Sequence, residues 1–229
     1  MSTQIPLSEL EVYSFCDPAS GKSVIKRVRA RSSIVVIGAD SINRIFVLMA
    51  WAGRPTTPIL VKKLIDVGDR YKGHLRRFGI EANAMQSLFA DLVSSQAKEL
   101  QRKIPFVPIM QPTKVDKDWR IRTTLQPLMN ADSGRLFVHE THHELKSELL
   151  SFPMGATKDL VDALASAVRL VPRRVSSERS DEQQQALASY LRESGLSPQQ
   201  IVQRLNEVRE EELALERARA AISLDNSVG

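Results

Sequence analysis

Apolar positions in the first fifty residues come in short runs, which predict strands. Residues 11–16 alternate polar and apolar side chains, and residues 33–38 form a β-branched run that ends in glycine. A third apolar run covers residues 45–50, and Asp40, Ser41 and Asn43 before it favour a turn. The short turn predicts an antiparallel hairpin from the second and third runs.

Beyond these three runs, the spacing of the apolar residues changes to the spacing that is typical of helices. A helix is predicted to start near Thr57 and Pro58, a suitable cap and first position. Its apolar positions are Leu60, Leu64, Val67, Tyr71 and Leu75. Beyond it, predicted strands at 78–80, 106–110 and 135–138 alternate with predicted helices at 83–102, 116–129, 142–151 and 159–171.

This order of elements predicts an α/β fold. Three strands in an antiparallel meander are followed by crossover units, which add parallel strands to the same sheet. The expected result is a mixed sheet flanked by helices, and the element order is that of the ribonuclease H-like fold. A plain doubly wound fold would alternate strand and helix from the start, so the opening hairpin counts against it.

Composition divides the chain after Pro172. Residues 1–172 are the predicted folded domain, 173–180 are a polar and basic linker, and 181–229 are a helical, acidic C-terminal tail with a helix start at Ser197 and Pro198. The net charge is +5, but residues 176–229 carry six Arg and ten Asp or Glu, so the preceding residues carry +9. A basic body favours a polyanionic partner such as nucleic acid, although a merely soluble basic domain has the same charge.

Other features narrow the class of protein. No apolar run is long enough to cross a bilayer, and the N-terminus lacks the pattern of a signal peptide. Cys16 is the only cysteine, which excludes an internal disulfide and a cysteine-rich zinc site. We therefore expect a cytoplasmic protein.

Acidic residues at the ends of predicted strands and at a helix start are candidates for metal binding. Asp17 follows the first strand, Glu81 follows residues 78–80, and Asp159 and Asp162 open the last helix. Hydrolysis of a phosphodiester can use two divalent ions about 3.5–4 Å apart, and Mg²⁺ or Mn²⁺ prefers carboxylate oxygens. Each acid alone has a structural explanation, namely a turn, a helix cap and a favourable helix N-terminus, so the prediction depends on their occurring together.

Over residues 10–172 the chain resembles the nuclease domain of tailed-phage terminase large subunits. The similar segments are 16–20 with Asp17, 80–81 with Glu81, 114–121 with a Lys-x-x-Lys-x-x-Arg pattern, the Gly134-Arg135 turn, and 152–163 with Phe152-Pro153 and Asp159. The resemblance implies a metal-dependent DNA endonuclease that cuts concatemeric viral DNA during genome packaging. It implies that Asp17 bridges two Mg²⁺ or Mn²⁺ ions.

The same resemblance assigns roles to other residues. Glu81 and Asp159 would each hold one ion, with Asp162 as a substitute or supporting ligand. Double-stranded DNA would meet four basic side chains, Lys114, Lys117, Arg120 and Lys158. For Lys117 and Arg120 a solvated helix face is the alternative. The implied partners are a terminase ATPase domain, a small terminase subunit and a portal protein, in the cytoplasm of a bacterial host.

Two positions depart from the family pattern. Lys158 stands where one of a pair of acids is usual, and Arg31 stands before the second strand where many relatives have an acid. Fewer carboxylates weaken the binding of at least one ion. The chain is then a weak nuclease, a nuclease whose second ion arrives with DNA, or a domain that has lost catalysis.

Alternative functions remain open at this stage. Another ribonuclease H-like enzyme, such as a junction resolvase, would prefer branched DNA. A non-catalytic module would bind DNA or a partner without cleavage.

Two other motifs are candidate sites. Three histidines within residues 139–143 suggest a zinc site, but their spacing matches no known catalytic pattern. Residues 21–23, Gly-Lys-Ser, end like a phosphate-binding loop, but the glycine that such a loop needs at its start is replaced by Cys16.

Overall fold

The computed structural model describes residues 5–19, 31–82, 86–111, 115–130 and 134–172, and a few positions between 189 and 204. The elements within these residues are η1 (Leu7–Glu9), β1 (Glu11–Asp17), β2 (Ser32–Ala39), β3 (Ile45–Gly53), α1 (Thr57–Arg70), β4 (Leu75–Glu81), α2 (Gln86–Glu99), β5 (Phe106–Ile109), α3 (Lys117–Met129), β6 (Leu136–Val138), α4 (His143–Ser151) and α5 (Asp159–Val168). The chain divides into two units, Met1–Gln111 with Thr124–Arg173, and Pro112–Thr123 with Arg174–Gly229.

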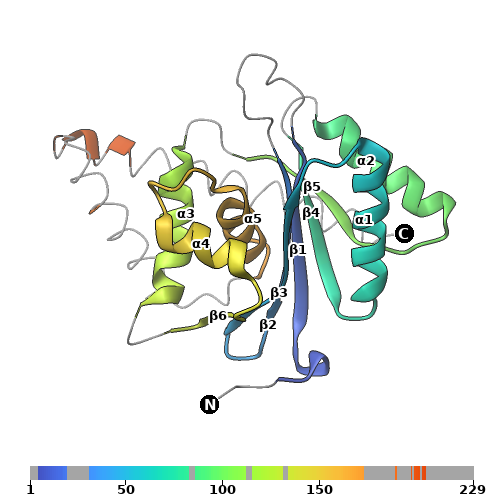
Figure 1. Ribbon diagram of the computed structural model, residues 1–229, viewed down its shortest axis with the longest axis horizontal. Coiled ribbons are helices and arrows are strands. Elements are labelled where there is room, and N and C mark those ends of the chain that lie inside the picture. The colour runs from blue at the N-terminus through green and yellow to red at the C-terminus, as the bar shows by residue number, and fades with distance from the viewer. Residues whose placement is uncertain are drawn as a thin grey trace. The chain divides into compact units, whose positions relative to one another are not determined.

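The six described strands form one mixed sheet in the first unit, in the order β5-β4-β1-β2-β3-β6 (Figure 1). β1, β2 and β3 are antiparallel neighbours. β4 runs parallel to β1, β5 runs parallel to β4, and β6 runs parallel to β3. The predicted meander with added parallel strands, a mixed sheet, is therefore confirmed.

Helices cover both faces of this sheet. Apolar side chains of α1, together with Ala90 and Val93 of α2, share a buried cluster with alternate residues of the central strands, including Val12 and Cys16 of β1. The intervening residues of these strands face the other side, where α5 packs on β1, β2 and β3. Figure 1 shows α1 and α2 on one side of the sheet and α4 and α5 on the other. Strands covered on both faces explain the continuous apolar run of β2.

Close packing between sheet and helix depends on a glycine in β4. A Cβ atom at Gly79 would lie 2.8 Å from Cδ2 of Phe15 and 3.1 Å from side-chain atoms of Ile109 and Leu170. Such contacts are shorter than van der Waals separation, so only glycine fits without a shift of its neighbours. Phe15 lies on the α5 face of β1, and Leu170 follows α5, so Gly79 allows α5 to approach the sheet.

The start and end of the first long helix differ from the prediction. Its N-cap is Thr56 rather than Thr57, and it ends at Arg70, so Tyr71 is the C-cap and Leu75 is the first residue of β4. Gly73 has a φ of 92°, which glycine adopts readily and which reverses the chain after the helix. Tyr71 and Leu75 thus continue the apolar spacing without continuing the helix.

The second unit is described at fewer positions. Trp119 N–H donates to Oδ1 of Asp116 at 2.9 Å, which caps the start of α3. Ser197 and Gln200 exchange hydrogen bonds between side chains and backbone, a capping box at the predicted helix start. The linker 173–180 lies outside the described residues, and the division into domain, linker and tail stays a prediction. No helix among the described residues is both long and apolar enough to cross a membrane.

Candidate functional site

Asp17 and Glu81 lie side by side at the carboxyl ends of two central strands. β1 and β4 are parallel, and their register pairs Cys16 with Ile80, so the next residues along the strands are Asp17 and Glu81. Neighbouring strands are about 4.8 Å apart. Cys16 and Ile80 belong to the α1 cluster, and side chains alternate along a strand, so both acids belong to the α5 face. The structure thus brings together two of the predicted metal ligands.

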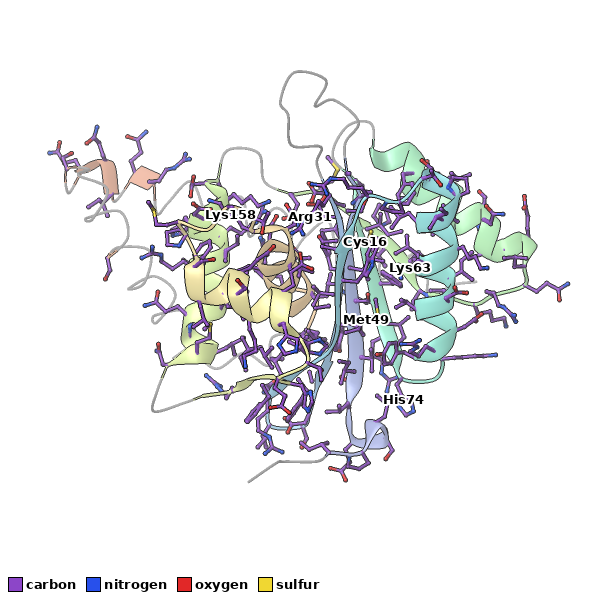
Figure 2. All side chains as sticks on the ribbon, in the orientation of Figure 1. Cys16, Arg31, Met49, Lys63, His74 and Lys158 are labelled. Carbon is purple, nitrogen blue, oxygen red and sulfur yellow. The ribbon has the colours of Figure 1, made fainter. Side chains whose placement is uncertain are left out.

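Both carboxylates influence the buried thiol of Cys16. Burial raises the pKa of its thiol well above the ordinary value, and the negative charges of Asp17 and Glu81 raise it further. Each carboxylate therefore raises the pKa of the same thiol from the carboxyl end of its strand. Figure 2 shows Cys16 on the side of the sheet that faces α1.

We expect the Cys16 thiol to be unreactive in the folded protein. Only the thiolate attacks a disulfide reagent, and a raised pKa keeps the buried thiol protonated at pH 8. Titration with a chromogenic disulfide should show no reaction in buffer within an hour and one thiol per chain in denaturant. Rapid reaction in buffer would contradict the buried position.

A buried hydroxyl lies next to Asp17. Ser33 of β2 pairs with Asp17 across the antiparallel ladder, and Ile34 beside it belongs to the α1 cluster, so Ser33 faces α5. Its side chain is fully buried, and Oγ has no hydrogen-bond partner within the described part of the chain. Buried polar atoms are normally satisfied, so this hydroxyl favours a polar ligand at the same place.

Arg31 is the centre of an ion-pair network at this end of the sheet. It directly precedes β2, and its guanidinium lies on the α4 and α5 side (Figure 2). Nε donates to Oδ2 of Asp159 at 2.9 Å, and Nη2 donates to Oε1 of Glu148 at 2.8 Å. Nη1 pairs with Oε1 of Glu144. One cation therefore meets three carboxylates through three different nitrogens.

Glu148 connects this network to the start of α5. Its side chain is 3% exposed. Oε2 accepts hydrogen bonds from the backbone N–H groups of Leu160 and Val161 at 2.8 and 3.1 Å, while Oε1 accepts from Arg31. The first N–H groups of a helix have no partner within it and carry partial positive charge. Glu148 thus satisfies the α5 terminus and the guanidinium together.

The guanidinium of Arg31 is permanently charged in this setting. Burial lowers its pKa, but hydrogen bonds and charge interactions with Asp159 and Glu144 outweigh burial, so the pKa lies above its ordinary value. Arg31 was noted in the sequence only as a departure, and Glu144 and Glu148 were not candidates. Their spacing of four residues places both on one face of α4, the only sequence signal that pointed to them.

Asp159 and Asp162 occupy different positions on α5. Asp159 is the first residue of the helix and is 30% exposed, and it pairs with Arg31. Asp162 lies one turn further along, 3% exposed, and its backbone N–H bonds to the carbonyl of Lys158. The Lys158 ammonium lies 6.0 Å from the centre of the Phe152 ring. Within the described ranges, no three His, Cys, Asp or Glu side chains are arranged to hold a metal ion.

Asp17 and Glu81 are the candidate ligands of a divalent ion, and Asp159 is engaged by Arg31. Mg²⁺ is commonly bound by one or two carboxylates, with water and substrate phosphate completing its shell. Asp17 and Glu81 provide such a pair, and the unsatisfied Ser33 hydroxyl lies beside it. A second ion would need Asp159, whose Oδ2 already accepts from Arg31. The two-ion arrangement expected from the sequence, with its metal roles for Asp159 and Asp162, stays a prediction.

Three basic candidates, Lys114, Lys117 and Arg120, belong to the second unit. Lys117 is the first residue of α3, and Lys114 lies outside the described residues. Arg120 is 7% exposed, so a solvated helix face does not describe it, and Trp119 beside it is also buried. Contacts of these basic residues with DNA stay predictions.

The structure gives no support to a zinc site at the three histidines of residues 139–143. His139 Nδ1 lies 2.9 Å from Thr141 Oγ1, and His142 Nε2 lies 3.2 Å from the carbonyl oxygen of Val47. These contacts hold the turn before α4, and neither histidine belongs to a metal-holding group in the part of the chain that is described. Residues 21–23 lie outside the described residues.

Comparisons with known proteins give limited information. No family model matches this chain, and no curated protein matches it. Among solved structures, a chain of "T. thermophilus RuvC in complex with Holliday junction substrate" aligns with 11% identity and a TM-score of 0.39, covering 69% of this chain and 90% of that chain. The strand order and directions described above remain the basis of the fold assignment.

Proposed function

We propose that this protein is a ribonuclease H-like endonuclease that hydrolyses phosphodiester bonds of DNA with a divalent ion held by Asp17 and Glu81. The observation that carries the proposal is the β1–β4 register, which sets the two acidic residues next to each other at the carboxyl ends of these strands. The unsatisfied Ser33 hydroxyl beside Asp17 supports a ligand at this place.

Each residue of the site has a defined task in this proposal. A bound ion would polarise the phosphate and lower the pKa of a water molecule. Asp17 and Glu81 would hold the ion, and its positive charge would offset their repulsion of the phosphate. Ser33 orients a polar group of the ion's shell or of the substrate. Burial of Cys16 and Ile80, the residues that directly precede the two acids, anchors the strand ends that carry them.

The basic body of the chain supports DNA as the substrate. Residues 1–175 carry a net charge of +9, which attracts the phosphate backbone without reading its sequence. Lys158, at the start of α5, and the basic residues 114–120 are the proposed phosphate contacts. Cleavage should then tolerate many sequences and weaken steeply as salt rises.

The biological setting follows from the sequence resemblance alone. We propose a terminase-type role, in which the domain cuts concatemeric viral DNA for packaging and works with an ATPase domain, a small terminase subunit and a portal protein. A second candidate is a non-catalytic DNA-binding module, because Arg31 already neutralises Asp159 and Glu148.

A cleavage assay tests the proposal. The whole chain is incubated with supercoiled plasmid and with a four-way junction, in Mn²⁺, in Mg²⁺ or with chelator. We expect nicking of the plasmid that needs the ion and falls at least tenfold between about 50 and 200 mM salt. Strong preference for the junction would favour a resolvase. DNA binding without cleavage in either metal would overturn the nuclease proposal and favour the binding module.

A further inference from the structure

We propose that the guanidinium of Arg31 takes the place of a second metal ion beside Asp159, so that the site binds one divalent ion instead of two. This inference rests on the proposed function, because it concerns the same acids. It makes Arg31 a positioning residue that determines how many ions the site accepts.

The geometry of Arg31 is that of a resident counter-cation. Nε, Nη1 and Nη2 are each directed at a different carboxylate, and the side chain is 14% exposed. An arginine provides several donors in a fixed planar fork, so it can satisfy carboxylates from more than one element at once. Here the carboxylates come from α4 and α5, and the cation comes from the residue before β2.

The charges explain why a cation is needed there. Glu144, Glu148 and Asp159 contribute three negative charges, and Glu148 is 3% exposed. A carboxylate as buried as Glu148 requires a compensating cation, and two further carboxylates close by add to this need, which a metal ion or a positive side chain can meet. The guanidinium meets this need from within the chain.

Arg31 precedes by two residues the β2 residue that pairs with Asp17. The ladder pairs Ser33 with Asp17, and Ser32 Oγ accepts a hydrogen bond from the backbone N–H of Ala19. The start of β2, which Arg31 directly precedes, is therefore hydrogen-bonded to the segment that follows β1. A divalent ion at Asp159 would have to displace the guanidinium and overcome its repulsion, whereas an ion at Asp17 and Glu81 leaves the ion pairs of Arg31 intact.

Counting bound Mn²⁺ tests the inference independently of cleavage. Free Mn²⁺ is measured by electron paramagnetic resonance during titration of the whole chain. We expect one ion for the wild type and for Arg31→Lys, which keeps the charge, and two for Arg31→Met, which keeps much of the volume. The additional ion of Arg31→Met should disappear in the double variant with Asp159→Asn. Two ions in the wild type, or one ion with unchanged affinity in a folded Arg31→Met variant, would overturn the inference.

A second measurement covers the case in which Arg31→Met does not fold. Asp159→Asn in the otherwise unchanged chain should alter Mn²⁺ affinity less than twofold, because Arg31 already engages this carboxylate. A loss of tenfold or more would show that Asp159 is a ligand despite Arg31 and would overturn the inference.

Failure of the proposed function gives a different result. Asp17→Asn and Glu81→Gln would then leave Mn²⁺ binding unchanged, whatever the Arg31 variants do. If the wild type bound no ion and Arg31→Met bound one, the exclusion of an ion from Asp159 by Arg31 would stand, whereas the ion site at Asp17 and Glu81, and with it the count of one ion, would fall.

Discussion

Asp17→Asn and Glu81→Gln are each expected to lower the rate of metal-dependent nicking by at least about 100-fold. Each replacement keeps the shape of the side chain and removes its charge. Because the pair supplies the only two adjacent carboxylates of the proposed ion site, losing one removes half of the ligand charge. A 100-fold loss corresponds to about 2.7 kcal/mol in transition-state free energy. Initial rates on supercoiled DNA at several Mn²⁺ concentrations would measure it.

The other end of β1 provides a matched control. Glu11 is 55% exposed and forms an ion pair with Arg76, far along the strand from Asp17. Glu11→Gln removes the same charge and should change the rate less than twofold. DNA affinity, measured by fluorescence anisotropy, should stay within threefold in all three variants. Acid variants that nick DNA as fast as Glu11→Gln would remove the support for this ion site.

Glu148→Ala is expected to reduce the free energy of unfolding by about 3–5 kcal/mol. The carboxylate is buried, accepts from Arg31, and satisfies two backbone N–H groups at the start of α5. Its removal leaves a partly buried cation with fewer partners and leaves two helix N–H groups unsatisfied, and breaking such a buried pair is costly. Urea denaturation followed by circular dichroism would measure the change.

Glu144 is the comparison for this effect. It pairs with the same guanidinium but is 51% exposed, so solvent already screens the interaction. Glu144→Ala should cost less than about 1 kcal/mol. Equal losses for the two variants would mean that burial and helix capping are not what makes Glu148 important.

Much of the fold could be predicted because its signals are local. A β-branched apolar run such as 33–38 is typical of a buried strand, and the turn at 40–43 connects it to the next strand. The proximity of two acids at strand ends could also be predicted from the sequence pattern, because neighbouring parallel strands have their carboxyl ends on the same side of the sheet. For this reason Asp17 and Glu81 were recognisable before the structure was known.

The Arg31 network could not be predicted in this way. Its partners Glu144, Glu148 and Asp159 are 113, 117 and 128 residues away in the sequence. Spacing within α4 shows that two glutamates share a face, but not which face turns toward β2. That choice depends on how α4 and α5 pack on the sheet, which is a tertiary property. The sequence therefore marked Arg31 as a missing acid, whereas the structure shows a cation with three acidic partners.

Gly79 is a tightly packed position two residues before Glu81 in β4. A methyl group there would crowd the Phe15 ring of β1 and the side chain of Leu170, which follows α5. These neighbours or the strand itself would have to shift, and we expect the strand end that carries Glu81 to shift as well. Substitutions at this glycine should therefore weaken ion binding and packing together, and a survey of variants should find position 79 as intolerant as the acids themselves.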